Sequence, residues 1–81
     1  MGTYIEHTIK PEWDEIEVAR KRSEDLLGEN KIPGEVIDAI TMVTGELIEN
    51  AIKYGTYNDE NGEITYYVGI TGNTVTVEVK N

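Results

Sequence analysis

Alternating apolar and polar residues mark the start of the chain as a β-strand. In residues 3–10, TYIEHTIK, the side chains of Ile5, His7 and Ile9 share one face and polar residues occupy most of the other. This period of two is typical of a half-buried strand. No second ligand type stands at a metal-site spacing from His7, so we interpret it as a partly buried strand histidine.

The clearest structural signal is a hairpin at the other end of the chain. Residues 63–70 and 74–80 flank Thr71–Gly72–Asn73, and Gly-Asn is a signal for a two-residue turn. With Gly72 and Asn73 as the loop, every cross-strand pair is apolar with apolar or polar with polar, as register requires. The apolar pairs are Ile70 with Val75, Val68 with Val77 and Tyr66 with Val79, and the polar pairs are Tyr67 with Glu78 and Thr65 with Lys80.

Two helices are expected between these strands. The first helix is predicted to begin at Pro11 and to end at Gly28. The acidic residues that follow Pro11 suit the positive end of the helix dipole. Pro33 opens a second, longer helix that ends at Gly55, and a polar loop over residues 56–62 follows. The expected core stripes are Trp13, Ile16, Ala19 or Arg20, Ser23, Leu26 and Leu27 in the first helix, and Val36, Ile37, Ile40, Val43, Leu47, Ile48, Ala51 and Ile52 in the second. The order β-α-α-β-β predicts an α+β two-layer sandwich, in which two helices cover one face of a three-stranded sheet.

Length and charge narrow the functional classes. With 81 residues the chain is at most a single small domain (1–81), and it has no cysteine for a disulfide or a Cys-based zinc site. Sixteen acidic residues against seven basic give a net charge of −9, which argues against binding nucleic acid or an anionic membrane. The start, MGTYIEH, lacks the apolar core of a signal peptide, and no apolar run approaches the ~20 residues that a membrane span needs. We therefore expect a soluble cytoplasmic protein.

One side of the second helix carries a candidate chemistry. Glu46, Asn50 and Lys53 are spaced i, i+4, i+7, so they line up beside the apolar stripe. Asparagine is mildly unfavourable in mid-helix because its amide competes for backbone hydrogen bonds, so the presence of Asn50 at this position needs an explanation. A carboxylate and a carboxamide oxygen one turn apart can hold hydrated Mg²⁺ or orient a water, and a lysine one turn further can contact a phosphate. Glu46 and Lys53 could equally be ordinary surface charges, and spacing alone leaves this open.

The segment Glu46–Gly55, ELIENAIKYG, resembles the asparagine box of the histidine-kinase-like ATPases, the GHKL or Bergerat-fold group. The layout upstream, a strand and one helix before the box helix, is most similar to the anti-sigma-factor serine kinases. The resemblance implies ATP as the nucleotide, with Asn50 coordinating the Mg²⁺ that bridges its phosphates, Glu46 acting as the catalytic general base and Lys53 lying near the phosphates. It also implies a protein partner, such as a sigma factor or an anti-sigma antagonist.

The second half of the family's nucleotide pocket is not found in these residues. In the family, an Asp-x-Gly-x-Gly segment reads the adenine and a glycine-rich lid follows it, whereas this chain ends at residues 79–81, about where the aspartate box begins. We therefore expect a truncated domain that does not turn over ATP by itself, either an excised fragment or a natural short relative. The strand at 74–80 would then present an unpaired edge with Val75, Val77 and Val79, which predicts a homodimer or a higher assembly.

Three interpretations of the function remain open from the sequence. The first is the Mg-ATP-binding half of a sensor-kinase or anti-sigma-kinase domain in bacterial-type signalling, incomplete for catalysis. The second is a non-catalytic protein-interaction or dimerisation module on the same scaffold. The third is a structural two-layer domain whose resemblance to the family is accidental.

Overall fold

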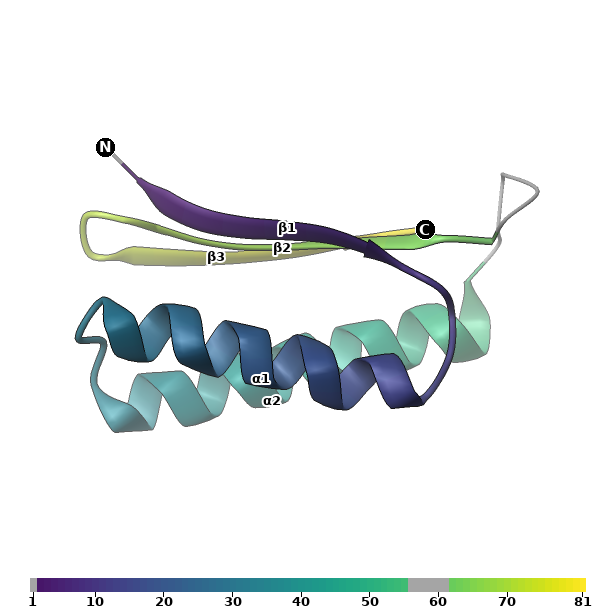
Figure 1. The fold of residues 1–81 in the computed structure, drawn as a ribbon, viewed down its shortest axis with the longest axis horizontal. Coiled ribbons are helices and arrows are strands. Elements are labelled where there is room, and N and C mark those ends of the chain that lie inside the picture. Colours follow the sequence, from purple (N-terminus) through teal and green to yellow (C-terminus); the bar gives the residue numbers. More distant parts are fainter. Residues whose placement is uncertain (1, 56–61) are drawn as a thin grey trace.

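The computed structural model describes residues 2–55 and 62–81, and the predicted loop over residues 56–62 lies almost entirely outside them. The elements are β1 (Thr3–Ile9), α1 (Asp14–Glu29), α2 (Gly34–Tyr54), β2 (Ile64–Thr71) and β3 (Thr74–Lys80). They form two layers, with the antiparallel sheet β1-β2-β3 on one side and both helices on the other (Figure 1). This confirms the predicted α+β sandwich and its β-α-α-β-β order.

The hairpin of β2 and β3 has the register that the sequence predicts. Ile70 lies opposite Val75 and Val68 opposite Val77, and the polar pairs follow in step. Gly72 takes a positive φ of 58° while Asn73 does not, as in a type II′ turn with glycine at its first central position. Turn chemistry and side-chain alternation both specify this register, which explains why it could be predicted in full.

Strand β1 completes the sheet by pairing antiparallel with β2, with Ile5 opposite Val68 and His7 opposite Tyr66. Its apolar face therefore continues that of the hairpin and turns toward the helices, as the alternation predicted. Tyr66 is fully buried, and its hydroxyl accepts a hydrogen bond of 3.1 Å from Nη1 of Arg22 on α1. The sheet and α1 are thus joined by a polar contact as well as by apolar packing.

Helix α1 starts later and ends later than predicted. It begins at Asp14, because Glu12 and Trp13 form a turn, and their carbonyls accept hydrogen bonds from the backbone N–H groups of Glu15 and Ile16. Trp13 was expected in the core, but in this turn it is 54% exposed. At the other end, Lys31 takes the left-handed conformation expected of Gly28, with φ of 59°. The backbone N–H of Ile32 then bonds the carbonyl of Leu27, which closes a Schellman-type cap without a glycine.

The core lies between the sheet and the inner faces of the helices. Its most buried members are Ile9, Ile16, Ala19, Ile48, Ile64 and Tyr66, with Ile5, Ala51, Ile52 and Val79 packed against them. All of them lie on the faces that the sequence assigned to the interior. Within the described residues, no helix is long and apolar enough to cross a membrane.

Helix α2 is less buried than its sequence predicts. Val36, Val43 and Leu47 were expected in the core, but 39%, 40% and 37% of their surfaces are exposed. With the half-buried Ile40 they form a separate apolar stripe on the side of α2, which we call the outer stripe. The helix has two adjacent apolar stripes, and only the one that contains Ile48 faces the sheet and α1.

On its other side, α2 approaches α1 closely at Gly45, which is buried. A side chain at this position would collide with the guanidinium of Arg20, which crosses α2 there. The Nε of Arg20 is buried without a hydrogen-bond partner in the described part of the chain, while its Nη1 bonds Glu17 at 2.9 Å. Gly45 therefore fixes α1 on one flank of α2 and leaves the outer stripe on the opposite flank.

Candidate functional site

The three residues of the candidate site lie along the side of α2 that points away from the core. Ile48, between them in sequence, is fully buried, whereas Glu46, Asn50 and Lys53 are all exposed. Because a helix advances 100° per residue, these positions occupy one arc roughly opposite Ile48. The structure thus brings the three side chains to one solvent-facing surface, as their spacing predicted.

Glu46 and Asn50 are free to engage a ligand. Neither side chain forms a hydrogen bond or ion pair with the described residues. Asn50 is exposed, so water satisfies its amide without a desolvation penalty. Its carboxamide oxygen, one turn from the Glu46 carboxylate, leaves a pair of oxygen ligands facing solvent.

Lys53 is engaged within the helix. Its Nζ lies 3.1 Å from Oε1 of Glu49, and this hydrogen bond and charge raise the pKa of Lys53 above its ordinary value. The ammonium also lies 6.0 Å from the centre of the Trp13 ring, at the limit of a cation–π contact. A bound phosphate would have to compete with Glu49 for this lysine. The role of Glu49 was missed, although its i, i+4 spacing to Lys53 signals such a pair.

The end of β3 lies beside this part of α2. Gly55 follows the helix directly, and a side chain at Gly55 would collide with the side chain of Asn81 and the carbonyl of Ala51. The backbone N–H of Gly55 bonds that carbonyl at 3.0 Å. The C-terminal ends of α2 and β3 therefore meet at one end of the molecule, close to Lys53.

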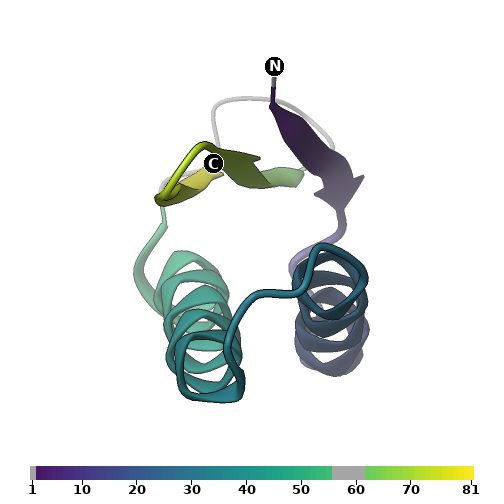
Figure 2. The same cartoon turned by 90° about the vertical axis from the view of Figure 1, so that its left-hand side faces the viewer.

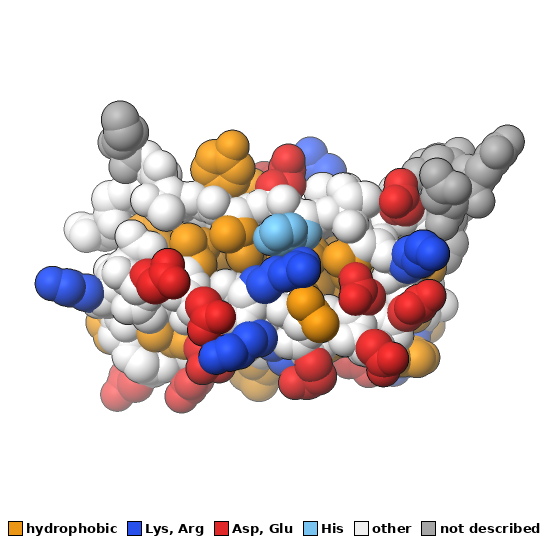
Figure 3. All heavy atoms as spheres, viewed as in Figure 1, with side chains coloured by type: hydrophobic (Ala, Val, Ile, Leu, Met, Phe, Trp, Pro, Cys, Tyr) orange, Lys and Arg blue, Asp and Glu red, His pale blue; other side chains and the backbone are white. Residues whose placement is uncertain are grey.

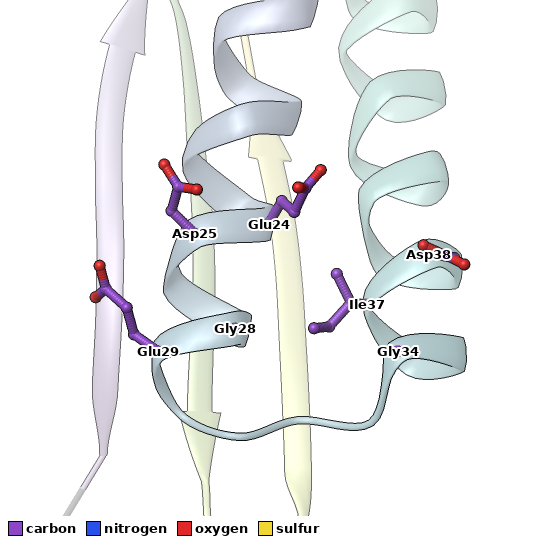
Figure 4. Close-up of a pocket in the computed structure, with 7 residues that line it drawn as sticks. All are labelled: Glu24, Asp25, Gly28, Glu29, Gly34, Ile37 and Asp38. Atoms are coloured by element: carbon purple, nitrogen blue, oxygen red, sulfur yellow. The ribbon is translucent and has the colours of Figure 1, made fainter.

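A hollow of about 580 Å³ lies at the opposite end, where α1 leads into α2 (Figure 4). Its lining carries four carboxylates, from Glu24, Asp25, Glu29 and Asp38. In Figure 4 these carboxylates point in different directions, and no group of acidic, His or Cys residues among the described residues is arranged to hold a metal ion. The local negative charge would repel a triphosphate, so this hollow is no candidate for the nucleotide.

Acidic side chains, interspersed with Lys and Arg, cover the helical layer on the face shown in Figure 3. The chain carries a net charge of −9, so a nucleotide with several negative charges would need a cation to approach α2. Mg²⁺ fits the donors available there, because it prefers oxygen ligands and is commonly held by only one or two protein oxygens, with phosphate and water completing the octahedron. Asn50 and Glu46 can supply such oxygens, and the rest would come from nucleotide and water.

Comparison with protein families agrees with this fold. The family model described as the histidine kinase-like ATPase domain matches residues 9–81. The match covers most of the chain, from the end of β1 through β3, and the chain therefore belongs to the histidine kinase-like ATPase domain family. No curated protein and no solved structure gave a significant match.

Proposed function

We propose that this chain binds Mg·ATP through the exposed side of α2, as the magnesium- and phosphate-binding part of a histidine kinase-like ATPase domain. The observation that supports it is that Glu46, Asn50 and Lys53 share one accessible surface of the helix, in a chain of this family. The Asn50 amide oxygen would hold Mg²⁺, and the ion would offset the charge of the phosphates. Lys53 would contact a phosphate after leaving Glu49, which lies on the same helix.

Glu46 is the candidate general base in this proposal. Its carboxylate is exposed and has no competing cation among the described residues, since the nearest lysine on the helix pairs with Glu49. It would accept the proton of an attacking hydroxyl or water. We place the protein in cytoplasmic signalling of the anti-sigma serine kinase type, with a protein as acceptor or partner; the similarity of the box helix and of the element order supports this assignment.

Titration calorimetry with Mg·ATP and Mg·ADP tests the nucleotide site. We expect saturable binding that disappears when EDTA removes the metal and weakens by roughly tenfold or more in Asn50→Ala, because one metal ligand is lost. Glu35→Gln is the control and should bind like the wild type, since Glu35 is exposed in the first turn of the same helix, far from Asn50. Equal binding by wild type and Asn50→Ala would contradict the proposal.

A second candidate is a non-catalytic protein-interaction module on the same scaffold. The exposed outer stripe of α2 favours it, because contiguous apolar surface on a small domain marks interaction sites. Absence of nucleotide binding at millimolar concentration, with the fold intact by circular dichroism, would favour this candidate over the first.

A further inference from the structure

The face of the sheet that points away from the helices carries an aromatic pair between two carboxylates. Figure 2 shows both helices beneath the sheet, so alternate strand residues turn to the opposite face. We call it the outer face, and one row of paired residues across it places Glu6 of β1, Tyr67 of β2 and Glu78 of β3 side by side. These residues lie on the faces of three paired strands, so their arrangement does not depend on what adjoins either edge of the sheet.

Tyr67 and Tyr4 form a stacked pair on the outer face. Their ring centroids are 5.4 Å apart and their planes differ by 24°. The Tyr67 side chain leans along β2 over Gly69, where any side chain would collide with the ring and its hydroxyl. Tyr4 lies directly opposite Gly69 on β1, so the absence of a side chain at Gly69 gives the two rings room to meet. Tyr4 is 62% exposed, which leaves an aromatic surface accessible to a ligand.

The carboxylates of Glu6 and Glu78 flank this pair without a partner. Both side chains are exposed, and neither forms an ion pair with a described residue, whereas Asp25 and Glu49 on the helices do. The two strands that carry them are two strand spacings apart, roughly 10 Å, with Tyr67 between them. Stacked rings stabilise a sheet by themselves, but two unpaired carboxylates beside them do not. The combination suits a cation with a flat surface.

We propose that the outer face binds an arginine side chain from a basic, extended segment of a partner protein. The guanidinium would stack on the tyrosine pair while its N–H groups donate to the carboxylates of Glu6 and Glu78. Arginine suits this arrangement because its planar guanidinium stacks on aromatic rings and carries five donors for carboxylates. Neighbouring basic residues of the segment would be attracted by the net charge of −9.

Other occupants match the outer face less well. No group of acidic, His or Cys residues in the described part of the chain is arranged to hold a metal ion. A nucleic acid would be repelled by the two carboxylates, and a second copy of this chain would bring its own net charge of −9 to them. A lysine would satisfy the carboxylates, but its ammonium is strongly hydrated and offers no plane to the rings. These comparisons select an arginine-bearing segment.

An NMR titration of the isotope-labelled protein tests the proposal without nucleotide, so its outcome is separate from that of the proposed function. The probe is an unlabelled peptide in which two arginines alternate with glycines, compared with the same peptide carrying lysine or the neutral analogue citrulline. We expect saturable shifts of the backbone amide peaks of Glu6, Tyr67 and Glu78 with the arginine peptide. The lysine peptide should bind several-fold more weakly and the citrulline peptide should not bind.

Two pairs of substitutions separate a local site from general attraction to an acidic protein. Glu6→Gln with Glu78→Gln should raise the dissociation constant by roughly fivefold or more, because both ion pairs are lost. Glu24→Gln with Glu29→Gln is the matched control, since it removes the same charge from exposed positions of α1 and should have a much smaller effect. Equal effects of the two pairs would overturn the proposal.

The aromatic contact is tested at Tyr4. Tyr4→Val should raise the dissociation constant by roughly threefold, whereas Tyr4→Phe keeps the ring and should bind like the wild type. Circular dichroism checks the fold of each variant, and Tyr4→Val provides the test if the double glutamine variant does not fold. An arginine peptide that does not bind at millimolar concentration, or peak shifts confined to the helices, would also overturn the proposal.

Discussion

The orientation of α2 can be tested by comparing a buried and an exposed apolar residue of that helix. Ile48 is fully buried in the core cluster, and Ile48→Ala deletes three carbon groups there. At about 0.8 kcal/mol for each group, the transfer term alone is about 2.4 kcal/mol, and the cavity raises the expected loss to about 2.5–4 kcal/mol. A domain of 81 residues has a free energy of unfolding of about 4–12 kcal/mol, so this variant approaches the limit of folding.

The assay is urea unfolding followed by circular dichroism, with all proteins at the same low micromolar concentration so that self-association contributes little. With a slope of roughly 1–2 kcal/mol/M, the midpoint for Ile48→Ala should fall by about 2 M. Met42→Ala should change the free energy of unfolding by less than about 0.5 kcal/mol, because Met42 is 56% exposed and both residues are good helix formers. Equal losses in the two variants would refute the described orientation of the helix.

Three further predictions concern the sheet. Burial and the nearby charge of Arg22 lower the pKa of His7 below its ordinary value of 6.5, so the unfolded chain binds a proton more readily than the folded one. The free energy of unfolding should therefore fall as the pH drops through 6.5 toward the folded pKa, and His7→Gln should flatten that part of the pH profile in urea titrations. Gly72→Val should lower the free energy of unfolding by about 1–2 kcal/mol or more, because the φ of 58° is strained for a side chain, whereas equal stability would contradict the turn assignment. Tyr66→Phe should lower the free energy of unfolding by about 1 kcal/mol, because the hydrogen bond from Arg22 to the Tyr66 hydroxyl is lost. Thermal unfolding measures this loss, and Tyr4→Phe, which changes an exposed tyrosine, is the control.

The hairpin could be predicted from the sequence completely, because its determinants are local, whereas the register of β1 against β2 joins residues far apart in the chain and was not predicted. The Gly72–Asn73 turn fixes the offset of the hairpin, and at that offset the period of two places apolar residues opposite apolar ones, such as Val68 opposite Val77. The helix boundaries were harder to predict from the sequence. Nothing in the composition around Lys31 signals a left-handed residue, and Gly28 carries the usual stop signal without being used.

Burial on α2 could not be predicted because apolar periodicity does not say which neighbour covers a stripe. Ile48 and Leu47 are adjacent and similar in size, yet one is fully buried and the other is exposed. The choice is made by the close approach of Arg20 to Gly45, a contact between residues far apart in sequence. The positions of Glu46 and Asn50 on one surface did follow from their spacing, whereas the pairing of Lys53 with Glu49 instead of a site partner depends on side-chain geometry.

The placement of the chain termini decides where a reporter can be attached. Thr3 pairs with Ile70 beside the hairpin turn, while Lys80 pairs with Thr65 at the other end of the sheet, and the molecule is 38 Å long (Figure 1). A fluorophore attached at Thr3 is therefore remote from Gly55 and leaves the exposed surface of α2 clear. One coupled next to Asn81 lies against the C-terminal end of that helix, so its emission would respond directly to a ligand arriving at Lys53.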